Sequence, residues 1–254
     1  MAWIRKDETL QQSTLPKHNL NVVVIGAGGG IGSALLSALE RDPNVANILS
    51  FARAPMNTSS KKTRSATLLL EDEASVKHAA AQVKAPLHLV IVATGLLYDK
   101  DHRPEKTWRE IDPEFMQKTL LVNTIGVATI AKFFLPLLDR AQPSHFAALS
   151  ARVGSISDNQ LGGWYSYRLS KAALNMLLKS LSIELARQNP RAACIGVHPG
   201  TVDTDLSRPF QSKHSRHPLF SPPIAAKNVL EVIAKSGPAD TGKVFAWDGT
   251  EIPA

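Results

Sequence analysis

The sequence has little of what marks secreted and membrane-spanning proteins. One cysteine, Cys194, in 254 residues excludes an intrachain disulfide framework, and its apolar surroundings indicate a small core residue. The longest apolar stretch, residues 120–138, is interrupted by Asn123, Lys132 and Pro136, whereas a bilayer span needs about 20 apolar residues. Residues 1–20 are charged and polar, lack a signal-peptide core and read as an irregular leader. We therefore expect a soluble cytoplasmic protein with no membrane partner.

Aromatic residues are also scarce, with Trp 4, Tyr 3 and Phe 8 in the whole chain. A net charge of +7 raises the question of nucleic-acid binding, but the basic residues are scattered and lack interleaved aromatics. Attraction to an anionic cofactor is a sufficient reason for the charge. Nucleic acid is not expected as a partner.

Short apolar runs alternate with longer helical patterns along residues 21–254. Strands are predicted at residues 21–25, 45–51, 67–70, 87–93, 145–150, 193–198 and 243–247. Helices are predicted at residues 31–41, 73–83, 113–139, 164–188 and 224–236. This alternation predicts one α/β domain, a Rossmann-type doubly wound parallel sheet of about seven strands with helices on both faces.

Glycines cluster between the first strand and the first helix, at Gly26, Gly30 and Gly32, with Ile31 inside the cluster. Strand, glycine turn and helix in this order favour a dinucleotide, whose pyrophosphate sits at the helix N-terminus. Any turn between a strand and a helix favours glycine, so the spacing and position carry this prediction.

The residues that follow other strands support a ligand at the same edge of the sheet. Gly95 follows the fourth strand, Ser150 ends the fifth, and Pro199 with Gly200 follows the sixth. In doubly wound sheets, ligands bind outside the carboxyl ends of the strands. These residues are therefore candidates for the binding site.

Arg53 follows the second strand, where no carboxylate occurs between Asp42 and Glu71. An NAD site usually has Asp or Glu there for the ribose hydroxyl, while arginine pairs with the 2′-phosphate of NADP. NADP(H) is the expected cofactor, with Arg53 as its phosphate ligand. A solvated loop arginine is the alternative, and the nearby cations Lys61, Lys62 and Arg64 could assist or substitute.

Tyr167 and Lys171 stand four residues apart in a helical pattern, so they share one face. An adjacent ammonium lowers the pKa of a phenol, which moves tyrosine toward useful acid/base chemistry. Alone, such a pair is more often part of an ordinary surface helix. The glycine turn upstream is what makes a catalytic pair the better interpretation.

Together these motifs resemble the short-chain dehydrogenase/reductase superfamily, from residue 21 to about residue 249. The resemblance implies that Tyr167 and Lys171 are catalytic, that Asn123 helps to hold a proton-relay water, and that residues 199–204, with Pro199 and Val202, contact the nicotinamide. Around Tyr167 and in residues 198–204 the chain is most similar to the C-factor and sniffer-type carbonyl-reductase branch. The family often forms dimers or tetramers, so a homo-oligomer is expected.

The chain departs from the family pattern at the end of the fifth strand. The usual pair of serines, of which the second binds the substrate carbonyl, reads Ser150-Ala151. Ser150, Ser155 or no serine fills the role, and we favour Ser150. The family has an asparagine-containing turn after the fourth strand, and of that turn this chain keeps only the glycine, Gly95.

The expected function is hydride transfer between NADP(H) and a carbonyl or alcohol substrate, with Tyr167 as proton donor. Residues 206–223 lack periodicity and are expected to form a substrate lid. They hold His214 and His217, but without supporting carboxylates or cysteines no metal is expected. A cofactor-binding regulatory protein with little turnover is the alternative, favoured by Ala151.

Overall fold

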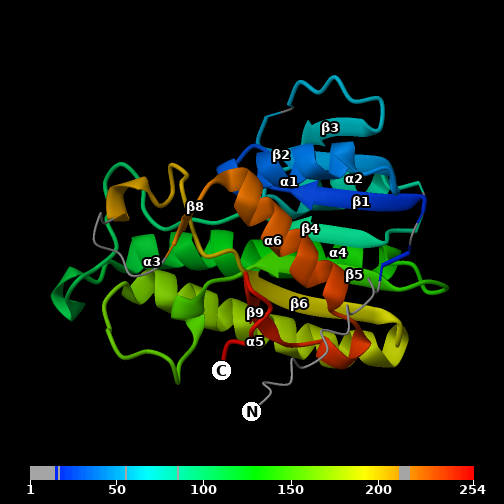
Figure 1. Ribbon diagram of the computed structural model, residues 1–254. Coiled ribbons are helices and arrows are strands. Elements are labelled where there is room, and N and C mark those ends of the chain that lie inside the picture. The colour runs from blue at the N-terminus through cyan, green and yellow to red at the C-terminus, as the bar shows by residue number, and fades with distance from the viewer. Residues whose placement is uncertain (1–14, 17, 55, 85, 212–217) are drawn as a thin grey trace, which may run out of the picture.

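The computed structural model describes residues 15–16, 18–54, 56–84, 86–211 and 218–254 of the chain. Residues 1–14 of the expected leader and residues 212–217 of the expected lid, with His214 and His217, lie outside the described residues. Seven parallel strands form one sheet in the order β3-β2-β1-β4-β5-β6-β9 (Figure 1). The sheet grows outward from β1 in both directions, which confirms the doubly wound Rossmann-type fold.

The strands lie close to their predicted positions, with one exception. They are β1 (Leu20–Ile25), β2 (Val45–Ala52), β3 (Thr63–Thr67), β4 (Leu89–Val92), β5 (Ser144–Leu149), β6 (Ala192–His198) and β9 (Val244–Ala246). The third strand was expected at residues 67–70, and this prediction was wrong. The edge strand is the mainly polar run before it, while Leu68 leaves the sheet to enter the core.

The helices cover both faces of the sheet (Figure 1). Leucines and valines of α1 (Gly30–Arg41) and α6 (Pro222–Lys235) pack on one face. The other face is covered by α2 (Glu73–Ala81), α4 (Gly126–Phe134) and α5 (Tyr165–Gln188). The central strands β1, β4, β5 and β6 are buried on both sides, as their continuous apolar runs require in a parallel sheet.

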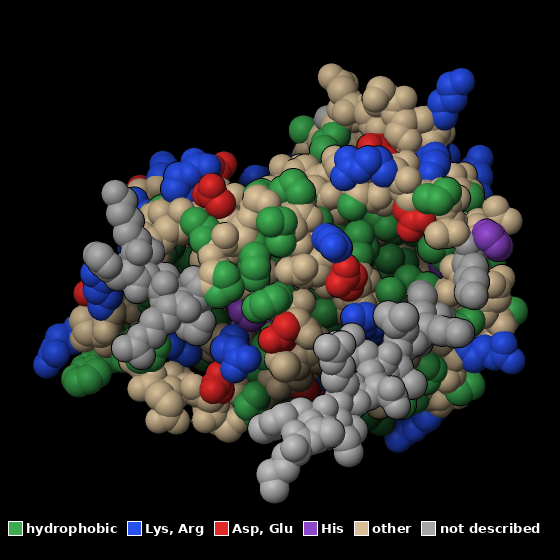
Figure 2. Space-filling view, viewed as in Figure 1, with side chains coloured by type: hydrophobic (Ala, Val, Ile, Leu, Met, Phe, Trp, Pro, Cys, Tyr) green, Lys and Arg blue, Asp and Glu red, His purple; other side chains and the backbone are tan. Residues whose placement is uncertain are grey.

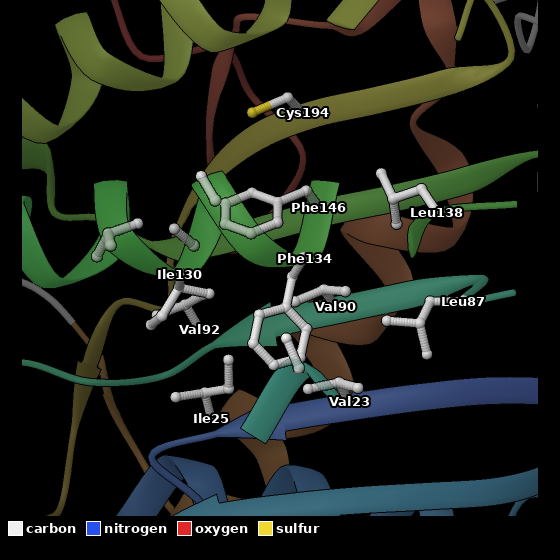
Figure 3. Packing of buried hydrophobic residues seen from close by; sticks show 14 of the residues in the cluster. Val23, Ile25, Leu87, Val90, Val92, Ile130, Phe134, Leu138, Phe146 and Cys194 are labelled. Carbon is white, nitrogen blue, oxygen red and sulfur yellow. The ribbon is translucent and has the colours of Figure 1, made fainter. Parts of the chain in front are cut away.

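Alternate residues of each strand point to opposite faces, so one strand supplies two cores. Val23 and Ile25 of β1 join Ile130 and Phe134 of α4 in the cluster that Figure 3 shows. Cys194 lies in the same cluster, where burial raises the pKa of its thiol to about 12. The cysteine is therefore an inert core residue, as its sequence surroundings predicted.

The helix expected at residues 113–139 is divided into four pieces. These are α3 (Pro113–Leu120), a π-helical segment η2 (Leu121–Ile125), α4 and a 3₁₀ turn η3 (Leu135–Leu137). A small second sheet, β7 (Thr201–Val202) with β8 (Leu219–Phe220), was not predicted. It joins the segment after β6 to the end of the expected lid.

The stretch Pro113–Leu137 is long and apolar enough, by length and composition alone, to cross a membrane. The polar residues within it therefore do not exclude such a span by composition, contrary to our expectation. In the structure 33% of its most apolar window is buried, and that face packs against the sheet.

Candidate active site

Two positions between the end of β1 and the first turn of α1 accept only glycine. Gly26 has a φ of +87°, and a Cβ there would lie 2.9 Å from the main chain of Ala93. A Cβ at Gly32 would lie 2.1 Å from the carbonyl oxygen of Gly26. The first turn of α1 therefore sits directly on the glycine turn, with its N–H groups at the carboxyl edge of the sheet. Such a helix start fits a cofactor pyrophosphate.

Gly30 brings a third segment to this turn. A Cβ on Gly30 would lie 2.5 Å from the Cγ2 atom of Thr204, so the segment after β6 packs directly on the start of α1. In that segment Val202 is buried in β7. Residues 199–204, expected to contact the nicotinamide, thus lie beside the glycine turn.

Arg53 lies one residue beyond β2 and is exposed. A Cβ on Gly28 would lie 3.5 Å from the Cβ of Ala52, so Arg53, the next residue, lies beside the glycine turn. Within the described part of the chain, no carboxylate forms an ion pair with Arg53. Lys62 is differently placed, because its Nζ atom donates to the carbonyl oxygen of Asp42 at 2.7 Å.

Lysine and arginine side chains lie over β2 and β3, at the top of the view in Figure 2, and recur elsewhere among acidic side chains. The positive charge near β2 suits the phosphates of a dinucleotide.

Asn123 lies in η2 and is buried. Its Oδ1 atom accepts from the N–H of Leu96 at 2.7 Å, and its Nδ2 atom donates to Leu96 O at 2.8 Å and to Ser170 Oγ at 2.9 Å. A Cβ on Gly95 would lie 3.8 Å from the same Oδ1 atom. Asn123 thus joins the turn after β4 to α5, one residue before Lys171. Only a lone pair on Oδ1 is left for a water.

The predicted pair lies on one face of α5, near its N-terminus. Lys171 is buried, and its Nζ atom donates to Leu149 O, at the end of β5, at 2.8 Å. The same atom lies 5.8 Å from the centroid of the Tyr167 ring. The pair is therefore at the carboxyl edge of the sheet, with the glycine turn and residues 199–204.

Burial dominates the pKa of both groups. It raises the pKa of Tyr167 to about 12 and lowers the pKa of Lys171 to about 8. The pKa of Tyr167 is therefore raised, and not lowered as we expected from the neighbouring ammonium, because burial sets the direction of the shift. The phenol therefore keeps its proton at neutral pH.

The two candidate serines are bound elsewhere. Ser150 Oγ donates to Asn175 Oδ1 at 2.6 Å, about 12 Å along α5 from Tyr167. Ser155 is buried, and its hydroxyl accepts from the N–H of Asp158 at 3.1 Å. Neither hydroxyl bonds to Tyr167 among the described residues. The structure thus gives no support to our preference for Ser150 as the group that binds the carbonyl.

An aromatic wall beside Tyr167 was missed by the sequence analysis. The Trp164 ring lies 6.3 Å from that of Tyr167 and 5.4 Å from that of Phe210, and Phe210 lies 5.5 Å from Tyr98. Phe210 belongs to the 3₁₀ turn η5 (Arg208–Phe210) of the expected lid. These rings come from three separate segments, so no spacing in the sequence could have joined them.

Comparisons with known proteins agree with this geometry. A family model described as short chain dehydrogenase matches residues 20–215. The C-signal protein of Myxococcus xanthus is 32% identical over 144 residues, which cover 57% of this chain and 81% of that protein. A 1-hydroxy-2-glutathionyl-2-methyl-3-butene dehydrogenase of Rhodococcus sp. (strain AD45) is also 32% identical, but the match spans only 55% of this chain and 59% of that enzyme.

Two solved structures share the fold over nearly the whole chain. The NADPH-bound carbonyl reductase from chicken fatty liver has a TM-score of 0.79 at 23% identity, with 95% of this chain and 96% of that chain covered. The carbonyl reductase Sniffer of D. melanogaster has a TM-score of 0.78 at 24% identity, with 93% of this chain and 100% of that chain covered. At this level of identity, the likeness concerns the fold.

Proposed function

The chain belongs to the short chain dehydrogenase family, and on this premise we propose that it is an NADP(H)-dependent oxidoreductase acting on carbonyl or alcohol compounds. One observation carries the proposal: Tyr167 and Lys171 lie on one face of α5, at the sheet edge that also holds the glycine turn. Residues 21–254 act as one catalytic domain, with the described lid residues 206–211 and 218–223 over the substrate.

In the reduction direction the bound cofactor supplies the hydride to the carbonyl carbon. Tyr167 donates the proton to the oxygen, and its pKa of about 12 keeps it protonated at neutral pH. Lys171, with a pKa of about 8, carries its charge at neutral pH and stabilises the phenolate left behind. Its bond to Leu149 O fixes the ammonium near the tyrosine ring.

Cofactor choice follows from Arg53, an exposed cation beside the glycine turn. A guanidinium holds a phosphate through two parallel bonds, so Arg53 favours the 2′-phosphate of NADP(H). The NADPH-bound chicken enzyme, which has the same fold, agrees with this choice. Michaelis constants for NADPH and NADH, measured on the wild type and on Arg53→Ala, test it. An unchanged ratio of the two constants would contradict it.

The substrate lies against the aromatic wall of Tyr98, Trp164 and Phe210 in this proposal. Flat aromatic faces favour apolar groups next to the reacting carbonyl. Oxidation of NADPH in the presence of aldehydes, ketones, quinones and diketones would show which class fits.

The proposal includes a homodimer or homotetramer in the cytoplasm. Three apolar side chains on the outer faces of η2 and α5 support self-association: Ile125, Met176 and Ile183 are 52%, 67% and 48% exposed. Met176 and Ile183 stand seven residues apart and so share one face of α5, and exposed apolar patches mark association sites.

The deciding experiment is Tyr167→Phe. This change removes only the hydroxyl, so NADPH binding is expected to persist, while carbonyl reduction falls by at least about 10²-fold through loss of the proton donor. Protein fluorescence measures binding, and NADPH absorbance measures turnover. Wild-type turnover in Tyr167→Phe would refute the assigned role.

Ala151 favours a second candidate, a cofactor-binding regulatory protein with little or no turnover. It stands where the family has its carbonyl-binding serine. A wild-type protein that binds NADPH but oxidises it with none of the four carbonyl classes would support this candidate.

A further inference from the structure

The helix that carries the proposed catalytic pair begins without a cap of its own. Its N-cap residue is Trp164, which makes no side-chain cap hydrogen bond and has left-handed backbone angles, φ 52° and ψ 43°. Gly162 and Gly163 before it also have positive φ angles, 62° and 64°. Glycine adopts such angles freely, whereas a bulky aromatic residue such as Trp164 keeps them only where surrounding contacts hold it.

Glu105 supplies the missing cap from 61 residues earlier in the chain. Both of its carboxylate oxygens accept from the N–H of Ser166 at 3.2 Å, and Oε1 also accepts from the Ser166 hydroxyl. The main-chain oxygen of Glu105 accepts from the N–H of Trp164 at 2.5 Å. Its exposed fraction is 3%, so this acidic side chain is buried at a positive helix N-terminus.

Arg168 holds the same turn from its other side. Its Nε atom donates to the carbonyl oxygens of Gly162 and Gly163 at 3.1 and 3.0 Å, and Nη1 donates to Val153 O at 3.3 Å. The left-handed turn is thus fixed between Glu105 and Arg168, and Tyr167 lies next to Ser166, whose N–H and hydroxyl Glu105 binds.

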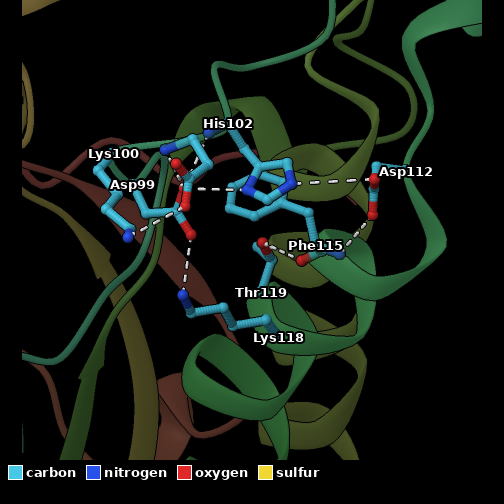
Figure 4. A network of polar contacts seen from close by, with 8 residues as sticks. Asp99, Lys100, His102, Asp112, Phe115, Lys118 and Thr119 are labelled. Atoms are coloured by element: carbon cyan, nitrogen blue, oxygen red, sulfur yellow. Dashed lines mark hydrogen bonds and ion pairs between the residues drawn. The ribbon is translucent and has the colours of Figure 1, made fainter.

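The segment that carries Glu105 is itself attached to α3 (Figure 4). Asp99 accepts from Lys118 Nζ at 2.8 Å and lies 3.0 Å from Nδ1 of His102. The Lys118 ammonium holds the pKa of Asp99 well below its usual range. The His102 ring stacks on Phe115 with a centroid distance of 4.7 Å. These contacts with α3 hold the segment that carries Glu105 in place beside α5.

We propose that Glu105 is a positioning residue for Tyr167: it caps α5 from a distant segment and thereby sets the direction of the phenol and of the Trp164 ring. This inference rests on the proposed function. Loss of the carboxylate leaves the buried N–H and hydroxyl of Ser166 without their partner. The first turn of α5 then loosens, and a displacement of about 1 Å at a reacting group can lower its rate about 10²-fold.

The test compares Glu105→Gln and Glu105→Ala with Asp72→Ala. Asp72 caps α2 through the N–H of Ala74 at 2.9 Å, so this control loses a cap on a helix outside the proposed site. We expect kcat to fall about 10-fold or more in Glu105→Ala and less in Glu105→Gln, which keeps one acceptor oxygen and its volume. The dissociation constant for NADPH should change less than about twofold, because α1 and its turn are untouched. Asp72→Ala should keep the wild-type kcat.

A second measurement follows the phenol directly, without turnover. The ultraviolet absorbance of tyrosinate after a jump to about pH 11, less that of the matching Tyr167→Phe protein, reports the ionised fraction of Tyr167. Glu105→Gln and Glu105→Ala should both raise this fraction, because water reaches a loosened first turn.

Failure of the proposed function would show as a wild-type protein without carbonyl reduction, and the phenol measurement would still decide the role of Glu105. An unchanged ionised fraction would overturn the inference. So would lowered thermal stability with kcat unchanged per folded molecule, since that result describes a purely structural cap. If Glu105→Ala does not fold, Glu105→Gln decides on the same criteria.

Discussion

Ala151 occupies the position at which the family pattern has the serine that binds the substrate carbonyl. It lies two residues beyond β5 and is 7% exposed, and the hydroxyl of neighbouring Ser150 is bonded to Asn175. Developing charge on a substrate oxygen is stabilised most by donors fixed in advance. The described residues give Tyr167 no hydroxyl partner for this task, so the proposed proton donor has no matching side-chain donor beside it.

Ala151→Ser is expected to add that donor. Loss of one such donor lowers rates about 10²–10³-fold in enzymes that depend on it, so its gain should raise kcat/KM by about 10-fold or more. Rates of NADPH oxidation with the best carbonyl substrate measure the effect. The same change in a Tyr167→Phe background should give no gain, because the hydroxyl assists proton transfer from Tyr167. A gain that persists there, or none in the wild type, would contradict the prediction.

Spacing predicted that Tyr167 and Lys171 share a face, because four residues make about one helical turn. It did not predict the direction of their pKa shifts. Those depend on how closely the loop after β5 packs: a Cβ on Gly154 would lie 2.7 Å from the main chain of Lys171. Such closeness follows from the tertiary fold rather than from the local sequence. The hydrogen-bond partners of Ser150 and Asn123 could not be predicted from the sequence for the same reason.

At the scale of elements, the alternation of apolar runs and helical patterns predicted all but one strand of the main sheet. The π-helical segment η2 was missed because long-range contacts accompany it: Asn123 bonds to Leu96 and Ser170, and Thr124 Oγ1 donates to Ser170 O at 2.8 Å. The position of Phe210 over Trp164 was missed because residues 206–223 have no periodicity. Buried strands are readable from sequence, whereas segments shaped by other segments are not.

The outer faces of η2 and α5 lead to a prediction about assembly. Met176→Glu places a charge on the most exposed apolar residue of α5 and should shift an oligomer toward monomers. Light scattering with size exclusion, at equal protein concentrations, measures the change. Ile224→Glu is the matched control, since Ile224 is 50% exposed on α6, and it should leave the mass unchanged. Equal masses for wild type and Met176→Glu would count against this interface.

Across the whole molecule, the two ends of the sheet hold different kinds of polar groups. The carboxyl ends carry the glycine turn, Arg53 and the Tyr167–Lys171 pair. At the amino ends of β4 and β5 lie two buried histidines: His88 directly precedes β4, and His145 is the second residue of β5. Burial lowers the pKa of both. The polar groups at the amino ends of the strands therefore bear on how the stability of the fold depends on pH, and not on the reaction.

His145 gives that dependence a testable form. Its Nε2 atom donates to Ser236 O at 2.9 Å, while Nδ1 is buried and has no hydrogen-bond partner among the described residues. Burial lowers its pKa, although Asp240 and the bond to Ser236 O act to raise it. Below about pH 6.5, His145 therefore binds a proton in the unfolded chain but not in the folded chain. The free energy of unfolding falls as the pH falls through this range.

His145→Gln keeps a donor that can reach Ser236 O but removes the titrating ring. The free energy of unfolding, from urea denaturation at about pH 7.5 and pH 5, should fall less in this variant than in the wild type. Some dependence should remain, because the pKa of His88 is lowered by burial in the same direction. Equal losses in both proteins would mean that His145 is not a source of the acid sensitivity. A larger loss in the variant would reverse the sign derived from its burial.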